Sequence, residues 1–267
     1  MSYSNYYLSS GFLHVSVPML MGTQMDALLF GDDRRQLEKV WKSAENELIL
    51  LEKMLNRFDP ESEISKINTN AQFSEVRISD ELWNILLDCR RYHKNTDGFF
   101  DITCRDFEKI IFKDDSKSIH FDQYGMFFDF GAYGKGYALK GIRHQLELAG
   151  IKRALVNFGN SSVLALGAHP HGDSWPVGVV DPANGSTIQT ISLFNNALSV
   201  SGNTLSRQSH IINPKTSELV TGDRMVAVVT DDPIDADVLT TAWIASENET
   251  VPDWMLKFDL KNTYKIK

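Results

Sequence analysis

Cysteine is scarce in this chain: Cys89 and Cys104 are the two cysteines among 267 residues. Two cysteines are too few for a disulfide framework. Because Cys89 lies on the apolar face of an expected helix, we expect it to be a buried, reduced thiol. Long hydrophobic runs are also absent. No stretch of roughly 18 apolar residues exists, so the sequence predicts no membrane-spanning helix.

Basic residues are in deficit as well. The chain carries 35 acidic and 27 basic residues, which gives a formal net charge of −8. Such a surface repels nucleic acid, and no cluster of Lys and Arg offsets it, so we exclude a nucleic-acid partner. A phosphate-bearing ligand would therefore need local cations, such as a metal ion.

The N-terminal segment also lacks the marks of a targeting signal. Residues 1–7 show no basic region followed by an apolar core and a small-residue cleavage site, and no lipid-anchor cysteine follows. From the sequence as it stands we expect a cytoplasmic protein. An exported form stays open if a leader was trimmed.

The pattern of apolar residues predicts an α+β fold, with helices packed on mainly antiparallel strands. The length suits one large domain or two small lobes. Apolar residues at spacings of three and four from Leu37 to Leu55 indicate a helix capped by Asp32 or Asp33. A short helical turn is expected within 61–65, and 254–267 is expected to close the chain as a helix or a strand. The other expected helices are 79–95, 135–149 and 235–246. The expected strands are two segments within 11–30, then 126–128, 154–156, 176–180, 188–194, 197–201, 209–212 and 225–229.

The most informative stretch is residues 129–138, Asp-Phe-Gly-Ala-Tyr-Gly-Lys-Gly-Tyr-Ala. We expect it to join a strand to a helix, where backbone N–H groups can face a phosphate. Its three glycines have the spacing of neither a P-loop nor a dinucleotide-binding Gly-x-Gly-x-x-Gly motif. A tight turn without a ligand is the alternative, and the glycines beside Lys135 favour the ligand site.

Asp237 and Thr241 lie four residues apart at the start of an expected helix and therefore share a face. A carboxylate and a hydroxyl are hard oxygen ligands that suit Mg²⁺. The alternative, for this motif alone, is a helix cap and a space-filling threonine. As a metal ligand, Asp237 is expected to line the surface of the site and to contribute little core packing.

Two further motifs carry chemistry. His210 opens an apolar strand that ends at Pro214, and an imidazole there can act as a general base near neutral pH. Its alternative is a hydrogen-bonded structural histidine. Phe99 and Phe100 stand beside Asp101 and can form a shelf for a flat ring, with the carboxylate accepting from an amine edge. Two core phenylalanines after a turn are the alternative.

The order of these motifs resembles that of the FAD:protein FMN transferase family, also called the ApbE-type family, over nearly the whole chain. The resemblance implies a single domain over residues 1–267, with an ApbE-like fold and two lobes around a central cleft. The matching segments, in the order of the family, are 21–23, 62–68, 98–103, 129–138, 154–159, 175–178, 181–182, 201–202, 210–214 and 236–242.

Members of this family bind FAD with Mg²⁺ and transfer its FMN half to a threonine or serine of an acceptor flavoprotein, releasing AMP. The resemblance implies the same enzyme activity here, with His210 as the base that takes the proton of the acceptor hydroxyl. The implied metal ligands are Asp237, Thr241 and the backbone carbonyl of Gly134, with Thr240 at the same site. The residues implied to line FAD are Met21, Phe58, Phe99, Phe100, Asp101, Gly131, Lys135 and Ile211.

The chain departs from the family pattern at several positions. The residues concerned are Lys140, Asn203 and Asn213, where an acid is usual, Asn160-Ser161, where Gly-Asp or Gly-Asn is usual, and Ser217, where Gly is usual. Two alternative functions therefore stay open. The departures could remove transfer, and the same groups could use water as the nucleophile in place of the acceptor hydroxyl. One is an FAD-binding protein that does not transfer, and the other is an FAD hydrolase that produces FMN and AMP.

Overall fold

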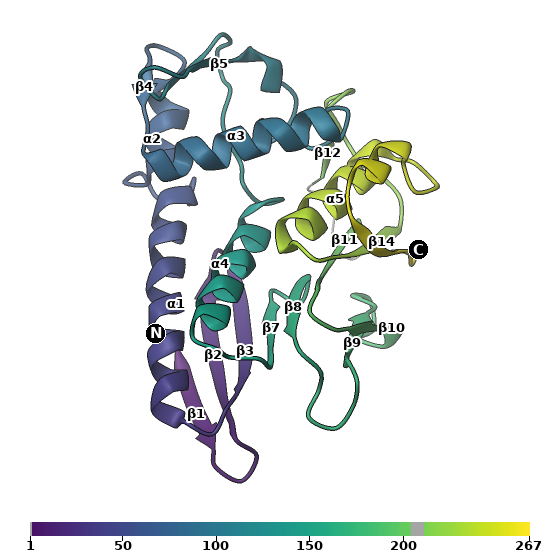
Figure 1. Cartoon of the computed structure of the whole chain (residues 1–267). Helices are drawn as coiled ribbons and strands as arrows, with labels where there is room; N and C mark the ends of the chain where they lie inside the picture. The colour runs from purple at the N-terminus through teal and green to yellow at the C-terminus, as the bar shows by residue number, and fades with distance from the viewer. Residues whose placement is uncertain (1, 204–210) are drawn as a thin grey trace.

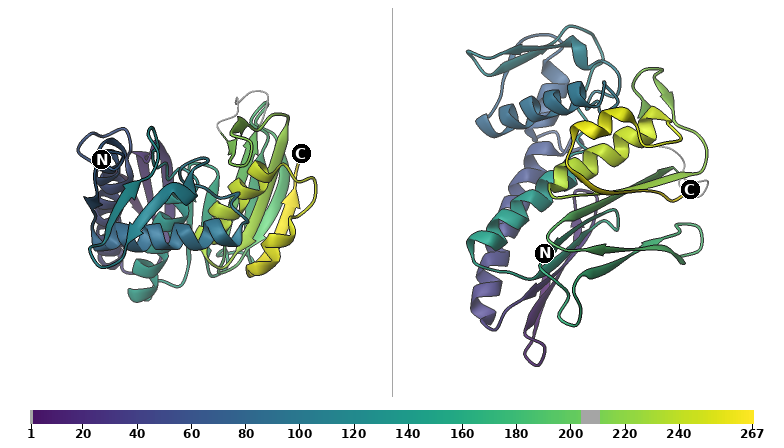
Figure 2. Two further views of the ribbon diagram at one scale, coloured as in Figure 1. Left: turned by 90° about the horizontal axis from the view of Figure 1, so that it is seen from above. Right: turned by 45° about the vertical axis from the view of Figure 1, so that its right-hand side comes forward.

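The structure, a computed structural model, describes residues 2–203 and 211–267 (Figure 1). Its centre is an antiparallel sheet of eight strands in the order β1-β2-β3-β7-β8-β11-β14-β15. The edge strands β1 and β15 contain the two ends of the chain, which lie at opposite ends of the sheet (Figure 2). The prediction of an α+β fold with mainly antiparallel strands is confirmed.

The elements have the following bounds. The helices are α1 Arg34–Leu55, α2 Glu63–Asn70, α3 Asp80–Asn95, α4 Gly134–Leu148 and α5 Pro233–Ser246, with short 3-10 helices at Phe107–Lys109 and Asp253–Lys257. The first strands are β1 Tyr3–Tyr7, β2 Phe12–Leu20, β3 Thr23–Phe30, β4 Val76–Arg77, β5 Ile110–Lys113, β6 Ser118–Phe121, β7 Ala154–Phe158 and β8 Ser162–Leu166. The remaining strands are β9 Trp175–Val180, β10 Thr187–Leu193, β11 Ala197–Asn203, β12 Ile212–Asn213, β13 Glu218–Leu219, β14 Arg224–Thr230 and β15 Leu260–Lys265.

The eight-stranded sheet is covered on both faces because side chains alternate along each strand. Helices α1, α4 and α5 pack on one face, where Val156 and Val228 belong to the larger core cluster. The hairpin of β9 and β10 packs on the other face, where Trp175 belongs to a second core cluster with the strand residues Val163 and Ala227. The candidate site lies on the helical face, where α4 and α5 meet β8 and β11.

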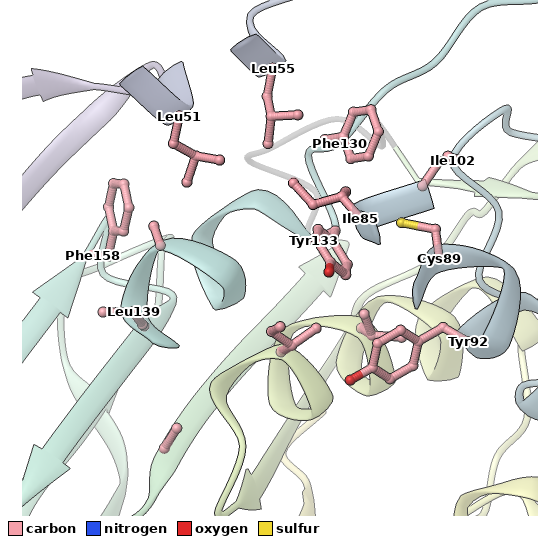
Figure 3. Packing of buried hydrophobic residues seen from close by; sticks show 14 of the residues in the cluster. Leu51, Leu55, Ile85, Cys89, Tyr92, Ile102, Phe130, Tyr133, Leu139 and Phe158 are labelled. Carbon is pink, nitrogen blue, oxygen red and sulfur yellow. The ribbon is translucent and has the colours of Figure 1, made fainter. Parts of the chain in front are cut away.

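Helix α1 shows how the sequence sets the local structure. The side chain of Asp33 accepts from the backbone N–H groups of Arg35 and Gln36 and thereby caps the helix. The predicted apolar stripe is buried from Leu37 to Leu55, facing β2 and α4. Figure 3 shows Leu51 and Leu55 at the end of this stripe, above α4.

Helix α5 is buried on nearly every side. It contacts β11 and β14 beneath it and α4 beside it, and Figures 1 and 2 show α4 and α5 on the same face of the sheet. Asp232 caps its first turn and Pro233 begins it. Polar residues on such a helix cannot reach bulk water, so Asp237 and Thr240 must find partners inside the protein.

The strand predicted at 126–128 is wrong. These residues belong to no strand, and at Phe128 the backbone bonds the side-chain amide of Asn68 in place of a neighbouring strand. Asn68 Nδ2 donates to the carbonyl of Phe128 (3.1 Å), and the Phe128 N–H donates to Asn68 Oδ1 (2.7 Å). The glycine turn thus follows a loop that the Asn68 side chain holds by two hydrogen bonds. The expected strand–helix–strand unit therefore lacks its first strand.

Other differences are smaller. The turn expected within 61–65 is the start of a two-turn helix, α2, capped by Ser62. The closing segment contains both a 3-10 turn and a strand, β15. The expected strand 209–212 is represented by β12, and residues 209 and 210 lie outside the described residues. Strands β4, β5 and β6 form a separate sheet that the sequence pattern did not indicate.

Cys89 is a buried free thiol, as predicted, in the cluster beneath α3. Figure 3 shows it near Ile85 and Tyr133, where α3 faces the start of α4. In the part of the chain that the structure describes, no helix combines the length and the apolar character that crossing a membrane requires.

Candidate functional site

The start of α4 lies against the first turn of α5. A Cβ atom on Gly136 would come within 2.6 Å of the Pro233 carbonyl oxygen and 2.8 Å of Ile234 Cα, both backbone atoms. Only glycine permits so close an approach. The Gly136 N–H donates to Asp237 Oδ2 at 3.0 Å. The glycine turn and the Asp237 helix are thus in direct contact, although their residues are far apart in sequence.

The carboxylate of Asp237 is surrounded by donors. Its Oδ1 accepts from Ser162 Oγ at 3.0 Å and from Ser199 Oγ at 3.2 Å, and Lys135 Nζ lies 3.5 Å from the same oxygen. The residue is 3% exposed, so the expectation that it lines the surface with little core packing is wrong. The reason is that the first turns of α5 are enclosed by α4 on one side and by β8 and β11 on another.

The two threonines that follow differ in their exposure. Thr240 is fully buried, and its Oγ1 accepts from Ser201 Oγ at 3.0 Å. Thr241 is half-buried; its Oγ1 donates to the Asp237 carbonyl at 3.2 Å and lies 3.4 Å from Ser201 Oγ. We call this set of side chains the oxygen cluster: Ser162, Ser199, Ser201, Asp237, Thr240 and Thr241.

The oxygen cluster fits a hard divalent cation. Its side chains offer one carboxylate and five hydroxyls, which are the donor types that Mg²⁺ accepts, often with waters and substrate phosphate completing the shell. Among residues 2–203 and 211–267, no three His, Cys, Asp or Glu side chains gather as they do at a zinc-type site. The chemistry of the donors therefore suits Mg²⁺ rather than a soft metal.

The turn between β2 and β3 completes this side of the site. Met21 has a positive φ of 48°, and its N–H donates to Glu52 Oε1 at 2.9 Å. Its Cε lies 3.2 Å from the position of a Cβ on Gly134. Met21 and Gly134, both predicted site residues, are therefore adjacent, and an alanine at position 134 would push against Met21.

Helix α3 holds the start of α5 from the other side. Tyr92 O–H donates to Asp235 Oδ1 at 2.5 Å. Burial raises the pKa of the Asp235 carboxyl above its ordinary value, while this hydrogen bond acts in the opposite direction. The bond ties the residue two positions before Asp237 to the core beneath α3.

A group of exposed side chains lies next to the glycine turn. The guanidinium carbon of Arg57 lies 4.5 Å from the ring centre of Phe58 and 5.4 Å from that of Phe127. Phe58 is 80% exposed. We call Arg57, Phe58 and Phe127 the aromatic face. A cavity of about 290 Å³ opens beside it, lined by Arg57, Phe58, Pro60, Ser65, Asn68 and Thr69.

Polar contacts connect the aromatic face to the oxygen cluster. Arg57 Nε lies 3.1 Å from Asp129 Oδ2, and Asp129 Oδ1 accepts from the Gly131 N–H at 2.8 Å. Lys135 Nζ in turn donates to the Gly131 carbonyl at 3.3 Å and lies 3.5 Å from Asp237 Oδ1. Gly131 and Lys135, predicted from the glycine turn, thus form the bridge between the two regions.

The predicted aromatic shelf is divided between core and surface. Phe100 is 1% exposed and packs against Tyr92 and Tyr133, at centroid distances of 5.9 and 6.4 Å, as the core alternative expected. Phe99 is half-buried, and Lys215 Nζ lies 5.7 Å from its ring centre. Phe99 can therefore offer part of its ring to a ligand, while Phe100 supports it from below.

Asp101 stabilises the loop that follows this shelf. Its Oδ1 accepts from the N–H and the hydroxyl of Thr103, both at 2.7 Å. Burial raises the pKa of its carboxyl, and the Thr103 bonds act to lower it. Ile211 is 7% exposed in the larger core cluster, and its carbonyl accepts from the Val220 N–H at 2.9 Å. His210 lies outside the described residues.

The residues that depart from the family pattern have structural partners. Lys140 Nζ lies 2.6 Å from Asp232, the cap of α5. Asn203 Nδ2 donates to the Val220 carbonyl at 2.6 Å, and Asn213 Nδ2 donates to Glu247 Oε1 at 3.0 Å. An aspartate could donate neither of the last two bonds. These asparagines therefore suit their local surroundings.

Sequence reasoning missed the serines and two cations of the site. Ser199 and Ser201 stand two apart in β11, so they share a face of the strand, and this period-two pattern was a signal that could have found them. Ser162, Arg57 and Lys215 had no comparable signal, because their roles depend on contacts between distant segments.

Comparisons with known proteins agree with the resemblance. A model of the ApbE family matches residues 21–118 and 104–262. The FAD:protein FMN transferase of Rhodobacter capsulatus is 35% identical over 134 residues, which is 47% of this chain and 25% of that protein. The enzyme of the same name from Klebsiella pneumoniae (strain 342) is 25% identical over 147 residues, 50% of this chain and 43% of that protein. The matches thus span less than half of either relative.

The fold is also that of a solved structure. The crystal structure of the ApbE protein from Thermotoga maritima MSB8 superimposes with a TM-score of 0.81 at 18% sequence identity. The superposition covers 96% of this chain and 97% of that one. The architecture is thus shared along nearly the whole length of both chains. Together with the family match over most of the sequence, this shows that the chain belongs to the ApbE family.

Proposed function

We propose that this chain is an Mg²⁺-dependent FAD:protein FMN transferase, which moves the FMN half of FAD to a threonine or serine hydroxyl of an acceptor flavoprotein and releases AMP. The observation that carries the proposal is the contact between Gly136 and Asp237, which joins the glycine turn to the oxygen cluster. Family membership and the names of its relatives support the same activity.

In this proposal Asp237, Thr241 and the Gly134 carbonyl hold Mg²⁺, with Thr240 beside them. When bound there, the cation neutralises charge on the pyrophosphate oxygens of FAD as AMP departs. Lys135, half-buried next to Asp237, contributes a second positive charge at the same place. The N-terminus of α4, where Lys135 stands, adds the positive end of a helix dipole near the same place.

The rest of the substrate needs orientation and a base. Phe58, on the aromatic face, and Phe99 offer rings against which the flat parts of FAD can stack. Along the path between the two regions, Met21, Gly131 and Asp101 complete the proposed lining, with Phe100 and Ile211 as buried support. His210, outside the described residues, keeps the role of base for the acceptor hydroxyl that the resemblance implies.

The test is a transfer assay with FAD, Mg²⁺ and an acceptor flavoprotein domain whose target threonine is unmodified. We expect a mass increase of one FMN on the acceptor, AMP in equal amount, and no product with Asp237→Ala. AMP without an acceptor would instead favour hydrolysis. Bound FAD with neither AMP nor adduct would favour a protein that only binds FAD.

Because Asp237 is buried, the alanine variant should also unfold more easily. It leaves the Ser162, Ser199 and Gly136 donors without their acceptor, which typically costs about 1–3 kcal/mol. Thermal unfolding of the variant, measured beside the assay, separates a lost ligand from a lost fold. Full activity of Asp237→Ala would remove Asp237 from the site.

A further inference from the structure

The hydroxyls of the oxygen cluster form an ordered row. Ser201 Oγ donates to Thr240 Oγ1 at 3.0 Å, Thr240 Oγ1 lies 3.1 Å from Ser199 Oγ, and Ser199 Oγ donates to Asp237 Oδ1 at 3.2 Å. Ser162 reaches the same carboxylate oxygen from β8 at 3.0 Å. Two strands and one helix thus send hydroxyls toward a single carboxylate.

We propose that Ser162 and Ser199 are positioning residues that fix the Asp237 carboxylate for a divalent cation, and that Thr240 belongs to this hydroxyl network rather than to the direct ligands. The inference rests on the Mg²⁺ site of the proposed function. Beyond that function, Ser162, Ser199 and Thr240 are given a role: they support the metal ligand Asp237.

The hydrogen bonds of the Asp237 carboxylate leave room for a cation on one of its two oxygens. An ionised carboxylate has about four lone-pair sites on its two oxygens. Ser162 and Ser199 use the two sites of Oδ1, and the Gly136 N–H uses one site of Oδ2. The site that is left lies on Oδ2. The serines therefore hold one oxygen and leave the other for a cation.

The two serines are buried, which makes their hydrogen bonds to Asp237 hard to replace. Ser162 is 2% exposed and Ser199 is 1% exposed, so water cannot replace either hydroxyl without rearrangement. A carboxylate that lost both donors could turn toward Lys135, whose Nζ lies 3.5 Å from Oδ1. With both serines in place, that rotation would break two hydrogen bonds.

The hydroxyl of Thr240 is already surrounded by oxygen atoms of the protein. Its Oγ1 lies 3.0 Å from the Ala236 carbonyl, 3.1 Å from the Asp237 carbonyl and 3.1 Å from Ser199 Oγ, and it accepts from Ser201. These four neighbours surround a fully buried oxygen. Thr241, which is half-buried, is the threonine that can face a ligand.

The test measures binding of Mn²⁺, as a paramagnetic substitute for Mg²⁺, to the full chain without FAD, by electron paramagnetic resonance. Loss of the partners that orient a metal ligand typically weakens metal affinity by about 10- to 100-fold. We expect a loss of this size for the double variant Ser162→Ala with Ser199→Ala, and a smaller loss for each single variant. Ser199→Thr, which keeps the hydroxyl, should restore most of the affinity.

Ser118→Ala is the matched control, because Ser118 is a buried serine of β6 in a separate sheet. It should leave Mn²⁺ affinity unchanged. Unchanged or tighter Mn²⁺ binding in the double variant would overturn the inference, as would a failure of the unaltered chain to bind Mn²⁺. If the double variant does not fold, the single variants decide in the same way.

The outcome is separable from that of the proposed function, since the measurement uses neither FAD nor acceptor. A chain that binds Mn²⁺ through this network and transfers no FMN would refute the transferase proposal and keep this inference. Valine has the shape of threonine and lacks its hydroxyl. Loss of Mn²⁺ binding in Thr241→Val, together with weaker but retained binding in Thr240→Val, would support the division between ligand and support, and equal losses in the two variants would overturn it.

Discussion

The oxygen cluster and the aromatic face lie at two ends of one site and are built in opposite ways. Asp237 is 3% exposed and meets donors from α4, β8 and β11, whereas Phe58 is 80% exposed and is contacted by the guanidinium of its chain neighbour Arg57. The position of the first is fixed by the packing of the core. The position of the second depends on side-chain rotamers, which a ligand can select.

This difference predicts where substitutions act. Changes in the oxygen cluster should affect stability and cation binding together, because the same contacts serve both. Changes in the aromatic face should affect ligand affinity alone, because exposed side chains contribute little to stability.

The largest effect is expected from Gly136→Ala. The added methyl group would meet backbone atoms of Pro233 and Ile234, which cannot turn aside, so α4 and α5 must separate. We expect cation binding to be lost and the free energy of unfolding to fall by about 1–3 kcal/mol. Mn²⁺ titration and urea unfolding would measure the two losses.

The matched control for this change lies in the same helix. A Cβ on Gly141 meets no atom within 4 Å, so Gly141→Ala should raise the free energy of unfolding by about 0.5–1 kcal/mol, through helix propensity alone. Normal Mn²⁺ binding in Gly136→Ala would contradict the view that the close approach of the two helices makes the site.

The second effect concerns the reactivity of Cys104, whose thiol lies near the charges of Asp129 and Arg57. Burial raises the pKa of the Cys104 thiol to about 11, and the nearby carboxylates of Asp129 and Asp101 act in the same direction. At pH 8 its reactive thiolate should then be about 200-fold rarer than that of a free cysteine with a pKa of about 8.5. The rate should rise with pH until the pH passes the raised pKa.

Alkylation by iodoacetamide, followed by mass spectrometry at pH 8 and pH 10, tests this expectation. The urea-unfolded chain serves as the fast control. The buried Cys89, whose pKa burial also raises, should react even more slowly in the folded chain. Modification of folded Cys104 at the rate of the unfolded chain would show that the surroundings of this thiol, next to Asp129 and Arg57, are open to water.

The smallest effect is expected from Phe58→Ala. A stacked ring pair contributes about 0.5–1.5 kcal/mol, so FAD affinity should fall by up to about ten-fold. Because Phe58 is 80% exposed, the free energy of unfolding should change by less than about 0.5 kcal/mol. Fluorescence titration of FAD and urea unfolding measure the two quantities.

Phe194→Ala is the control for this change, since Phe194 is 53% exposed and lies at the far end of β10. It should leave FAD affinity unchanged. A large loss of stability in Phe58→Ala would mean that the aromatic face is part of the folded core and would remove the contrast with the oxygen cluster.

The sequence predicted what depends on local pattern. The spacing of leucines gave α1, and the Asp33 cap set its start. The pairing of the glycine turn with the helix of Asp237 was also anticipated, and the Gly136 contact confirms that the two meet. The order of the motifs gave the resemblance to a family, which no single motif could have given.

What the sequence could not supply depends on contacts across the fold. The apolar run at 126–128 has the composition of a strand, but the backbone of Phe128 bonds the side chain of Asn68 instead of a neighbouring strand. The burial of Asp237 follows from the packing of α5 against both α4 and the sheet. The serines that hold its carboxylate come from β8 and β11, and a serine in a strand carries no mark of its partner.

The pairing of β3 with β7 has a consequence for how the protein is made. Met25 lies opposite Phe158 in that pair, and four α-helices separate the two strands in the chain. On the ribosome, β3 leaves the exit tunnel long before its neighbour exists, so an apolar strand waits with an unpaired edge. Nascent chains that stop before β7 should therefore be the species most in need of a chaperone.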